Sequence, residues 1–189
     1  SKKGEVRAKI ATMLLDAVQR GELKASIARS ADFYGPWADE KSMFYQTVFK
    51  NYAEGKKAQW LGNPDMPHSM SYTLDCAKGL ALLAGDPTSF NQTWHLPTHN
   101  PPPVPKDLIQ LVAKDMGVPY KGVQVATKTI TRLIGLFVPI MREMVEMIYQ
   151  NEQPYWFDST KFEQHFQYQP ISYEQGILDT IAFYNLKKG

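Results

Sequence analysis

The composition of this 189-residue chain narrows its class before any motif is considered. It carries 21 Lys and Arg against 19 Asp and Glu, a formal net charge of +2, which gives no electrostatic footprint for nucleic acid or an anionic membrane. With 43% hydrophobic residues it can bury a core, and its single cysteine, Cys76, excludes an internal disulfide framework and a cysteine-rich zinc site.

Apolar segments along the sequence indicate the compartment. The apolar run at residues 133–141 is too short to cross a bilayer and is interrupted by Pro139. Residues 1–7 lack the apolar stretch of a signal peptide. We therefore expect a cytoplasmic protein with no membrane or nucleic-acid partner.

The first elements are a helix and a strand. Apolar residues from Val6 to Val18 recur at helical spacing until Gly21 stops the run, and residues 23–31 follow as a strand. Gly and Pro break regular structure at residues 32–36. Because ligands in open α/β sheets lie at the carboxyl ends of strands, residues 32–37 are the first predicted site.

The rest of the chain predicts small strands and helices built onto the end of a sheet, and hence an α/β fold. The predicted strands are residues 57–62, 69–72, 91–96 and 123–126, and the predicted helices are 42–55, 74–84, 106–116, 129–150, a short helix capped at 158–160, and 176–186. Residues 100–105 form a stiff, proline-rich connector, and a structural turn is preferred there over a ligand for a proline-binding module. Ser172 and Gln175 have capping-box spacing.

Three segments, in order, carry a resemblance to a known family. Residues 29–36 (Arg-Ser-Ala-Asp-Phe-Tyr-Gly-Pro) resemble the Arg-x-x-Asn-x-Tyr-Gly-Pro block that follows the sixth Rossmann strand in extended short-chain dehydrogenases. Residues 67–77 are similar to that family's short strand leading into an Asp-x-Ala helix start, and residues 157–177 resemble its C-terminal helices. Over essentially its whole length, the chain resembles the C-terminal, substrate-binding half of an NAD(P)-dependent epimerase/dehydratase, as an atypical member.

This resemblance implies an architecture and a cofactor. It implies the last strands and helices of a Rossmann-type sheet plus a small mixed α/β substrate-binding domain. Residues 1–36 would be the remnant of the dinucleotide-binding domain, and residues 37–189 the substrate-binding domain with returning sheet elements. NAD or NADP would bind only with an N-terminal half, because the sequence has no Gly-rich turn of the kind that holds the pyrophosphate. This fragment alone is not expected to be active.

The catalytic pair of the family is replaced in this sequence. Lys3 and Arg7 stand where the family has Tyr-x-x-x-Lys, and no tyrosine precedes Tyr34, so the catalytic residues are not identified. The resemblance implies cofactor contacts from Arg7, Asp32 and Tyr34, and substrate contacts from Asp32, Pro36, Phe44, His68 and Ser69. Asp32 replaces an asparagine that positions a nucleotide sugar. A carboxylate there would repel a pyrophosphate, which favours a less charged or cationic small molecule.

Several candidate residues have a structural alternative. Asp75 is interpreted as a helix N-terminal carboxylate, Tyr34 as either a packing or a ligand-contacting residue, and His68 as a solvated loop histidine rather than a substrate contact. His95 and His99 are not placed on a helix and lack a third ligand, so no metal site is expected.

For several aromatic and methionine residues, a place in the core is weighed against a place in a binding site. Core filling is preferred to an aromatic cleft for Trp37, Phe44, Trp60 and Trp94. A core or subunit seam is preferred to a cofactor site for Met141, Met144 and Met147.

Two hypotheses for function follow. The first is the substrate-binding half of an NAD(P)-dependent epimerase, dehydratase or reductase acting on a sugar-like or small hydroxyl- or carbonyl-bearing molecule. The second is a non-catalytic binding or regulatory module that keeps the fold without the Tyr-x-x-x-Lys chemistry. Exposed apolar surface where a Rossmann sheet would continue is expected to drive the chain either to form a homodimer or to aggregate.

Overall fold

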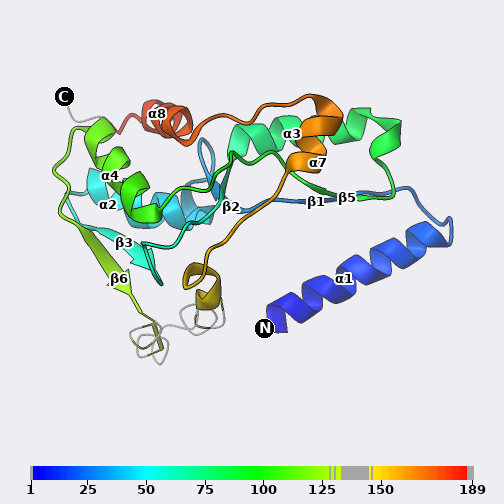
Figure 1. Cartoon of the computed structure of the whole chain (residues 1–189), viewed down its shortest axis with the longest axis horizontal. Helices are drawn as coiled ribbons and strands as arrows, with labels where there is room; N and C mark the ends of the chain where they lie inside the picture. The colour runs from blue at the N-terminus through cyan, green and yellow to red at the C-terminus, as the bar shows by residue number, and fades with distance from the viewer. Residues whose placement is uncertain (1, 128, 130, 133–144, 146, 187–189) are drawn as a thin grey trace.

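The computed structural model of the chain describes residues 2–127, 129, 131–132, 145 and 147–186 (Figure 1). The strands are β1 (Ile27–Arg29), β2 (Asp32–Tyr34), β3 (Ala58–Leu61), β4 (Met70–Tyr72), β5 (Thr93–His95) and β6 (Val123–Ala126). The α-helices are α1 (Lys2–Gln19), α2 (Lys50–Ala53), α3 (Thr73–Gly85), α4 (Pro105–Met116), α7 (Thr160–Phe166) and α8 (Tyr173–Phe183). Short helical turns are η1 (Asp39–Lys41), η2 (Tyr45–Phe49), η3 (Pro87–Ser89) and η4 (Ile148–Asn151). The α/β fold class is confirmed.

The strands form three short parallel pairs. β1 pairs with β5, β2 with β4, and β3 with β6. Helices α3 and α7 lie on one side of the β1–β5 pair, and α1 lies on the other side, apart from the rest of the chain (Figure 1). The molecule is therefore closely packed on one side of these strands and open on the other.

The main core lies where β2, β3 and β4 meet η2, α4 and α8. Its buried residues include Tyr34, Phe44, Val48, Phe49, Trp60, Met70, Tyr72, Ile109, Val112, Met116, Tyr173 and Ile177. A second cluster, under α3 and α7, contains Cys76, Leu83, Trp94, Leu96 and Phe162. The core-filling interpretation of Phe44, Trp60 and Trp94 is therefore confirmed, whereas Trp37 lies exposed against the Phe183 ring at 4.5 Å between centroids.

Of the strand predicted at residues 23–31 only Ile27–Arg29 forms a strand, and the break predicted at residues 32–36 is wrong for Asp32–Tyr34, which form a second strand. The chain pairs with β5 only as far as Arg29, and the Ala31 amide then donates to the Ser71 hydroxyl at 3.0 Å. This bond moves the chain from one partner strand to the next, so Asp32–Tyr34 form β2 instead of a loop. The turn follows at Gly35, whose φ of +122° and contact with the Tyr72 ring exclude a side chain.

The C-terminal helices show how local signals set boundaries. The Ser172 hydroxyl accepts from the Gln175 amide at 3.3 Å, so the predicted cap is confirmed and α8 begins at Tyr173 rather than at residue 176. The predicted helix over residues 129–150 lies mostly outside the described residues. Its described end, Ile148–Asn151, is a 3₁₀ turn.

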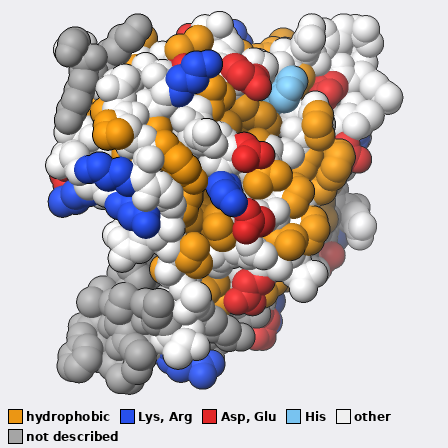
Figure 2. All heavy atoms as spheres, turned by 60° about the vertical axis from the view of Figure 1, so that its left-hand side comes forward, with side chains coloured by type: hydrophobic (Ala, Val, Ile, Leu, Met, Phe, Trp, Pro, Cys, Tyr) orange, Lys and Arg blue, Asp and Glu red, His pale blue; other side chains and the backbone are white. Residues whose placement is uncertain are grey.

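The distribution of charged and apolar side chains over the surface agrees with the small net charge of the sequence. On the face in Figure 2, acidic and basic side chains are scattered among hydrophobic ones. Among the described residues, every helix falls short of the length and apolar character needed to span a membrane.

Candidate functional site

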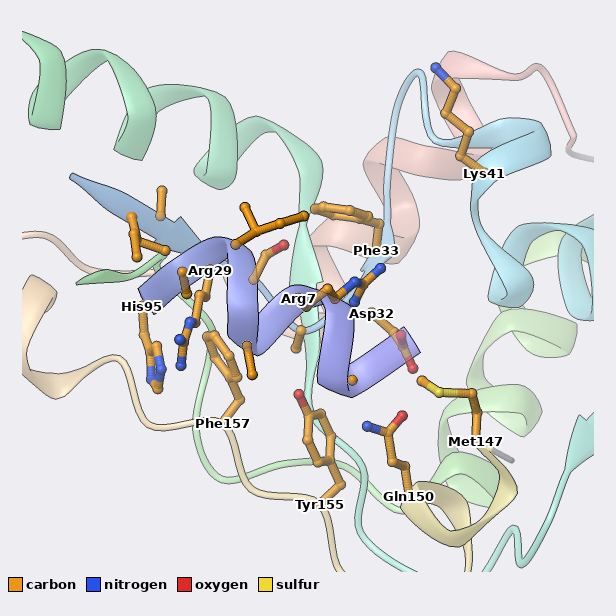
Figure 3. Close-up of a pocket in the computed structure, with 18 of the residues that line it drawn as sticks. Arg7, Arg29, Asp32, Phe33, Lys41, His95, Met147, Gln150, Tyr155 and Phe157 are labelled. Atoms are coloured by element: carbon orange, nitrogen blue, oxygen red, sulfur yellow. The ribbon is translucent and has the colours of Figure 1, made fainter. Parts of the chain in front are cut away.

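A cleft of about 980 Å³ separates α1 from the strands β1 and β2 (Figure 3). Arg7 and Ile10 line it from α1, and residues 26–33 line it from the strands. The third wall comes from residues 147–157, including Tyr155 and Phe157. The cleft thus runs along the whole of β1 and reaches beyond its carboxyl end, where an α/β sheet places its ligands.

Asp32 is a predicted site residue that lines this cleft with an exposed side chain. Its side chain is 68% exposed, and its Oδ2 lies 2.9 Å from Nε2 of His68, whose side chain is only 3% exposed. A carboxylate can only accept, so Nε2 carries the hydrogen in this bond. His68 is therefore a buried histidine that holds a cleft carboxylate, and its interpretation as a solvated loop residue is wrong.

Aromatic rings enclose His68. The Trp60 ring meets it edge-on at 5.6 Å between centroids, and the Tyr155 ring lies 4.8 Å away. The backbones of His68 and Tyr155 form a parallel bridge. Nδ1 of His68 is buried and has no hydrogen-bond partner in the described part of the chain. Burial, with a smaller contribution from the charge of Asp32, raises the pKa of Tyr155, so this phenol keeps its proton at neutral pH.

The other end of the cleft is aromatic and basic. His95 donates from Nδ1 to the Asp158 carbonyl at 2.7 Å, because a carbonyl cannot donate, and its ring stacks on Phe157 at 4.4 Å. Arg29 is the register partner of His95 in the β1–β5 pair. Both side chains line the cleft beside Phe157 (Figure 3). This end offers donors and positive charge together with a flat apolar surface.

Three of the predicted substrate and cofactor contacts do not line the cleft, namely Tyr34, Pro36 and Phe44. Tyr34 is 1% exposed, between the rings of Tyr72 and Tyr173 at 5.5 and 5.7 Å, which favours the packing interpretation. Phe44 is in the same core. Pro36 is buried, and its carbonyl accepts from the Thr73 hydroxyl at 2.8 Å. These placements give Tyr34, Pro36 and Phe44 structural roles.

Ser69 and Arg7 act at the edges of the site. The Ser69 hydroxyl is buried and accepts from the Phe157 amide at 2.9 Å, which fixes a residue of the cleft wall. Arg7 lines the cleft from α1, and Lys3 lies one turn earlier in that helix, with its side chain outside the described part.

Asp75 has a structural role of another kind. It lies in the first turn of α3, as predicted, but is buried and accepts from the Tyr168 hydroxyl at 2.7 Å and the Ile171 amide at 2.9 Å. These bonds tie the C-terminal segment to α3.

Metal-binding candidates are not brought together. In the described ranges no group of three potential ligands is close enough to hold a metal ion, and His99 packs against Tyr173. Met147 lines the cleft, while Met141 and Met144 fall outside the described residues.

Sequence reasoning missed Arg29, Tyr155 and Phe157 as cleft residues. Arg29 stood in the motif of residues 29–36 but was not assigned a role. Tyr155 and Phe157 carry no local signal, because they reach the cleft only through bonds to residues 67–69.

Comparison with known proteins confirms the expected fold. No protein-family profile matches the sequence, and no curated protein is significantly similar to it. The fold is that of the C-terminal portion of NAD-dependent epimerases and dehydratases of the extended short-chain dehydrogenase/reductase family.

Individual solved structures show how far the likeness extends. The dTDP-glucose 4,6-dehydratase of Bacillus anthracis, solved with NAD, matches 98% of this chain and 52% of its own, with a TM-score of 0.75 and 15% identity. The UDP-glucose 4-epimerase of Thermotoga maritima, solved with UDP-glucose, matches 92% of this chain and 50% of its own, with a TM-score of 0.69 and 18% identity. The UDP-glucuronic acid 4-epimerase of Bacillus cereus, solved with NAD, matches 86% and 45%, with a TM-score of 0.61 and 18% identity. The chain spans about half the length of these structures.

Proposed function

We propose that this chain forms the substrate side of an NAD(P)-dependent enzyme acting on a sugar-like or other small hydroxyl- or carbonyl-bearing molecule. The observation that carries the proposal is the cleft of about 980 Å³ under α1, in a fold that matches an NAD-bound dehydratase over 98% of the chain. A cleft of this size suits a small organic ligand.

The residues of the chain fit one end of the cofactor. The sequence offers no glycine-rich turn for a pyrophosphate, so that group would be held by residues outside the chain. Ile10, Phe33 and Phe157 give the cleft apolar surfaces that suit the flat nicotinamide ring. When bound, NAD or NADP would supply hydride transfer, and the chain would orient the ligand and exclude water.

Charge in the cleft supports a ligand that carries an anionic group. Arg7, Arg29 and Lys41 line it, and Asp32 is the single carboxylate among its described lining residues. The sequence expectation of a less charged or cationic ligand rested on Asp32 alone. Because three cationic side chains line the same cleft, we favour a phosphate or carboxylate on the ligand, directed to the Arg29 and His95 end.

A non-catalytic binding module is the alternative. It is favoured by α1, which carries Lys3 and Arg7 where the related enzymes are expected to have their Tyr-x-x-x-Lys pair. The exposed apolar residues Val6, Ile10 and Met13 on the same helix support the proposal of a homodimer. A cytoplasmic location remains a prediction from the sequence.

The test uses the natural polypeptide that contains this chain, isolated with an antibody. Its mass is measured, then its binding of NADH and NADPH by fluorescence, and then turnover with neutral sugars, sugar phosphates and nucleotide sugars. We expect Arg29→Ala to raise the KM for an anionic substrate about tenfold or more, because a charged hydrogen bond contributes roughly 1.5–3 kcal/mol, and to leave a neutral sugar unaffected.

Lys106→Ala is the matched control, because Lys106 is a surface cation paired with Asp65 outside the cleft. It should change neither KM. A natural polypeptide of the same 21.5 kDa as this chain that binds neither nucleotide would support the binding module instead.

A further inference from the structure

The Asp32–His68 pair has a geometry that structural packing does not require. A buried imidazole holds a carboxylate whose own side chain faces an open cleft. We propose that Asp32, oriented by His68, accepts and returns the proton of a ligand hydroxyl in this cleft. The inference rests on the proposed function and names the proton-handling group of that site.

One carboxylate oxygen of Asp32 is hydrogen-bonded to His68, and the other is available to a ligand. Oδ2 accepts the hydrogen bond from Nε2 of His68 at 2.9 Å, and no described residue donates to Oδ1. Figure 3 shows the Asp32 side chain near Met147, Gln150 and Tyr155 at one end of the cleft. A ligand hydroxyl in that space can donate to Oδ1 while Oδ2 stays anchored.

His68 is a positioning residue with little freedom. Trp60 and Tyr155 enclose its ring, and its amide donates to the Pro103 carbonyl at 3.0 Å. Nδ1 is one of four buried side-chain polar atoms without a hydrogen-bond partner in the described part of the chain, and because leaving it so is unfavourable, its place beside Asp32 calls for a reason. Fixing the orientation of the carboxylate provides that reason.

Other groups in the cleft are less suited to take a proton. Helix α1 has no tyrosine, and the raised pKa of Tyr155 keeps that phenol protonated. Asp32 is the only carboxylate among the described lining residues. The titratable and charged groups that face this space are Arg7 from α1, Arg29 from β1, Lys41 from η1, His95 from β5, and His68 and Tyr155 beside Asp32.

The proton step balances as an alcohol oxidation. The hydroxyl O–H bond breaks and its proton goes to Oδ1 of Asp32, while the C–O bond becomes a carbonyl. The oxidant required would be bound NAD(P)⁺, which would supply the acceptor for the hydride from the same carbon. In the reverse direction Asp32 returns the proton to the carbonyl oxygen, and its exposed side exchanges protons with water.

The experiment compares four variants of the natural polypeptide. We expect Asp32→Asn to lower kcat by on the order of 10²–10⁴, with KM and NADH binding little changed, and to remove the acid limb of the pH–rate profile. His68→Gln keeps an N–H donor and should restore most of the rate that His68→Leu loses. Asp86→Asn, in the surface pair with His165, is the matched control and should leave kcat and the pH–rate profile as in the wild type.

A second readout does not depend on turnover. In ¹⁵N-imidazole spectra of the 189-residue chain, we expect His68 as the Nε2–H tautomer, with a signal that shifts in Asp32→Asn and stays in place in Asp86→Asn. A His68 signal indifferent to Asp32→Asn, or a kcat retained by that variant in an active protein, would overturn the inference and leave the proposed function standing. Absence of both cofactor binding and turnover in the wild type would overturn both.

Discussion

Within three residues, β2 runs from the cleft into the core, and its two ends follow different rules. Asp32 begins the strand with most of its side chain exposed, whereas Tyr34 ends it with 1% exposed between two other tyrosines. On the core side each atom is fixed by neighbours at contact distance. On the cleft side a polar group is held at one atom and left free at another. We therefore expect substitutions that disturb the core end of β2 to change stability, and substitutions at its cleft end to change function.

The largest effect is expected on the core side, from Gly176→Ala. A Cβ at this glycine of α8 would lie 2.5 Å from the Tyr34 hydroxyl oxygen and 3.0 Å from Cζ, and the buried ring cannot retreat. Overpacking of this kind destabilises by roughly 1–3 kcal/mol. Urea unfolding of the two proteins measures it as a lower midpoint with an unchanged slope.

Gly85→Ala is the matched control for that substitution. Gly85 ends α3, and a Cβ there has nothing within 4 Å. We expect its stability to be unchanged or raised by up to about 1 kcal/mol, because alanine favours a helix. Equal losses in the two variants would mean that the contact with Tyr34 does not set the effect.

The sequence predicts those parts of the fold that local patterns determine. Helical spacing located α1, α3 and α4, and Ser172 was recognised as a cap although the helix after it was predicted to begin three residues too late, because each signal lies within or beside the element itself. The start of a second strand at Asp32 could not be foreseen from the sequence. It depends on the Ser71 hydroxyl, 40 residues from the Ala31 amide that it captures.

For the candidate site too, the sequence allowed single residues to be named but not the contacts between them. Asp32 and His68 were named as separate candidates, since each stands in a recognisable segment. Their bond joins residues 36 apart, and the cleft wall at Tyr155 depends on a bridge to His68 from still farther along the chain. Such contacts follow from the packing of the whole chain, which a single sequence does not reveal.

A second histidine–carboxylate pair, Asp86 with His165, extends the comparison. Its effect on stability is expected to be smaller than that of Gly176→Ala. Asp86 accepts from His165 at 2.6 Å and from the Thr88 amide at 2.9 Å, and these bonds, the first above all, hold the pKa of Asp86 below its ordinary 3.8. The folded state then binds a proton less readily than the unfolded chain. The contribution of Asp86 is complete above about pH 5 and is lost as the pH falls through the lowered pKa.

Urea midpoints between pH 2 and pH 7 test this linkage. We expect Asp86→Asn to be less stable than wild type at pH 6 and to converge with it at the acid end. Since both side chains are partly solvated, the difference should be smaller than that of Gly176→Ala. A gap that persists unchanged at pH 2 would show that the pair acts through packing.

The smallest effect on stability is expected from Asp32→Asn. The side chain is mostly exposed, and the new amide oxygen can still accept from Nε2 of His68, so the unfolding free energy should stay within about 0.5 kcal/mol of wild type. The same substitution is expected to cost the most in proton transfer, because an amide cannot take the proton of a hydroxyl. If its urea midpoint falls as far as that of Gly176→Ala, Asp32 belongs to the packed side of β2 and the separation of the two ends is wrong. If stability holds while proton transfer is lost, the carboxylate is kept at the start of β2 for its chemistry and not for the fold.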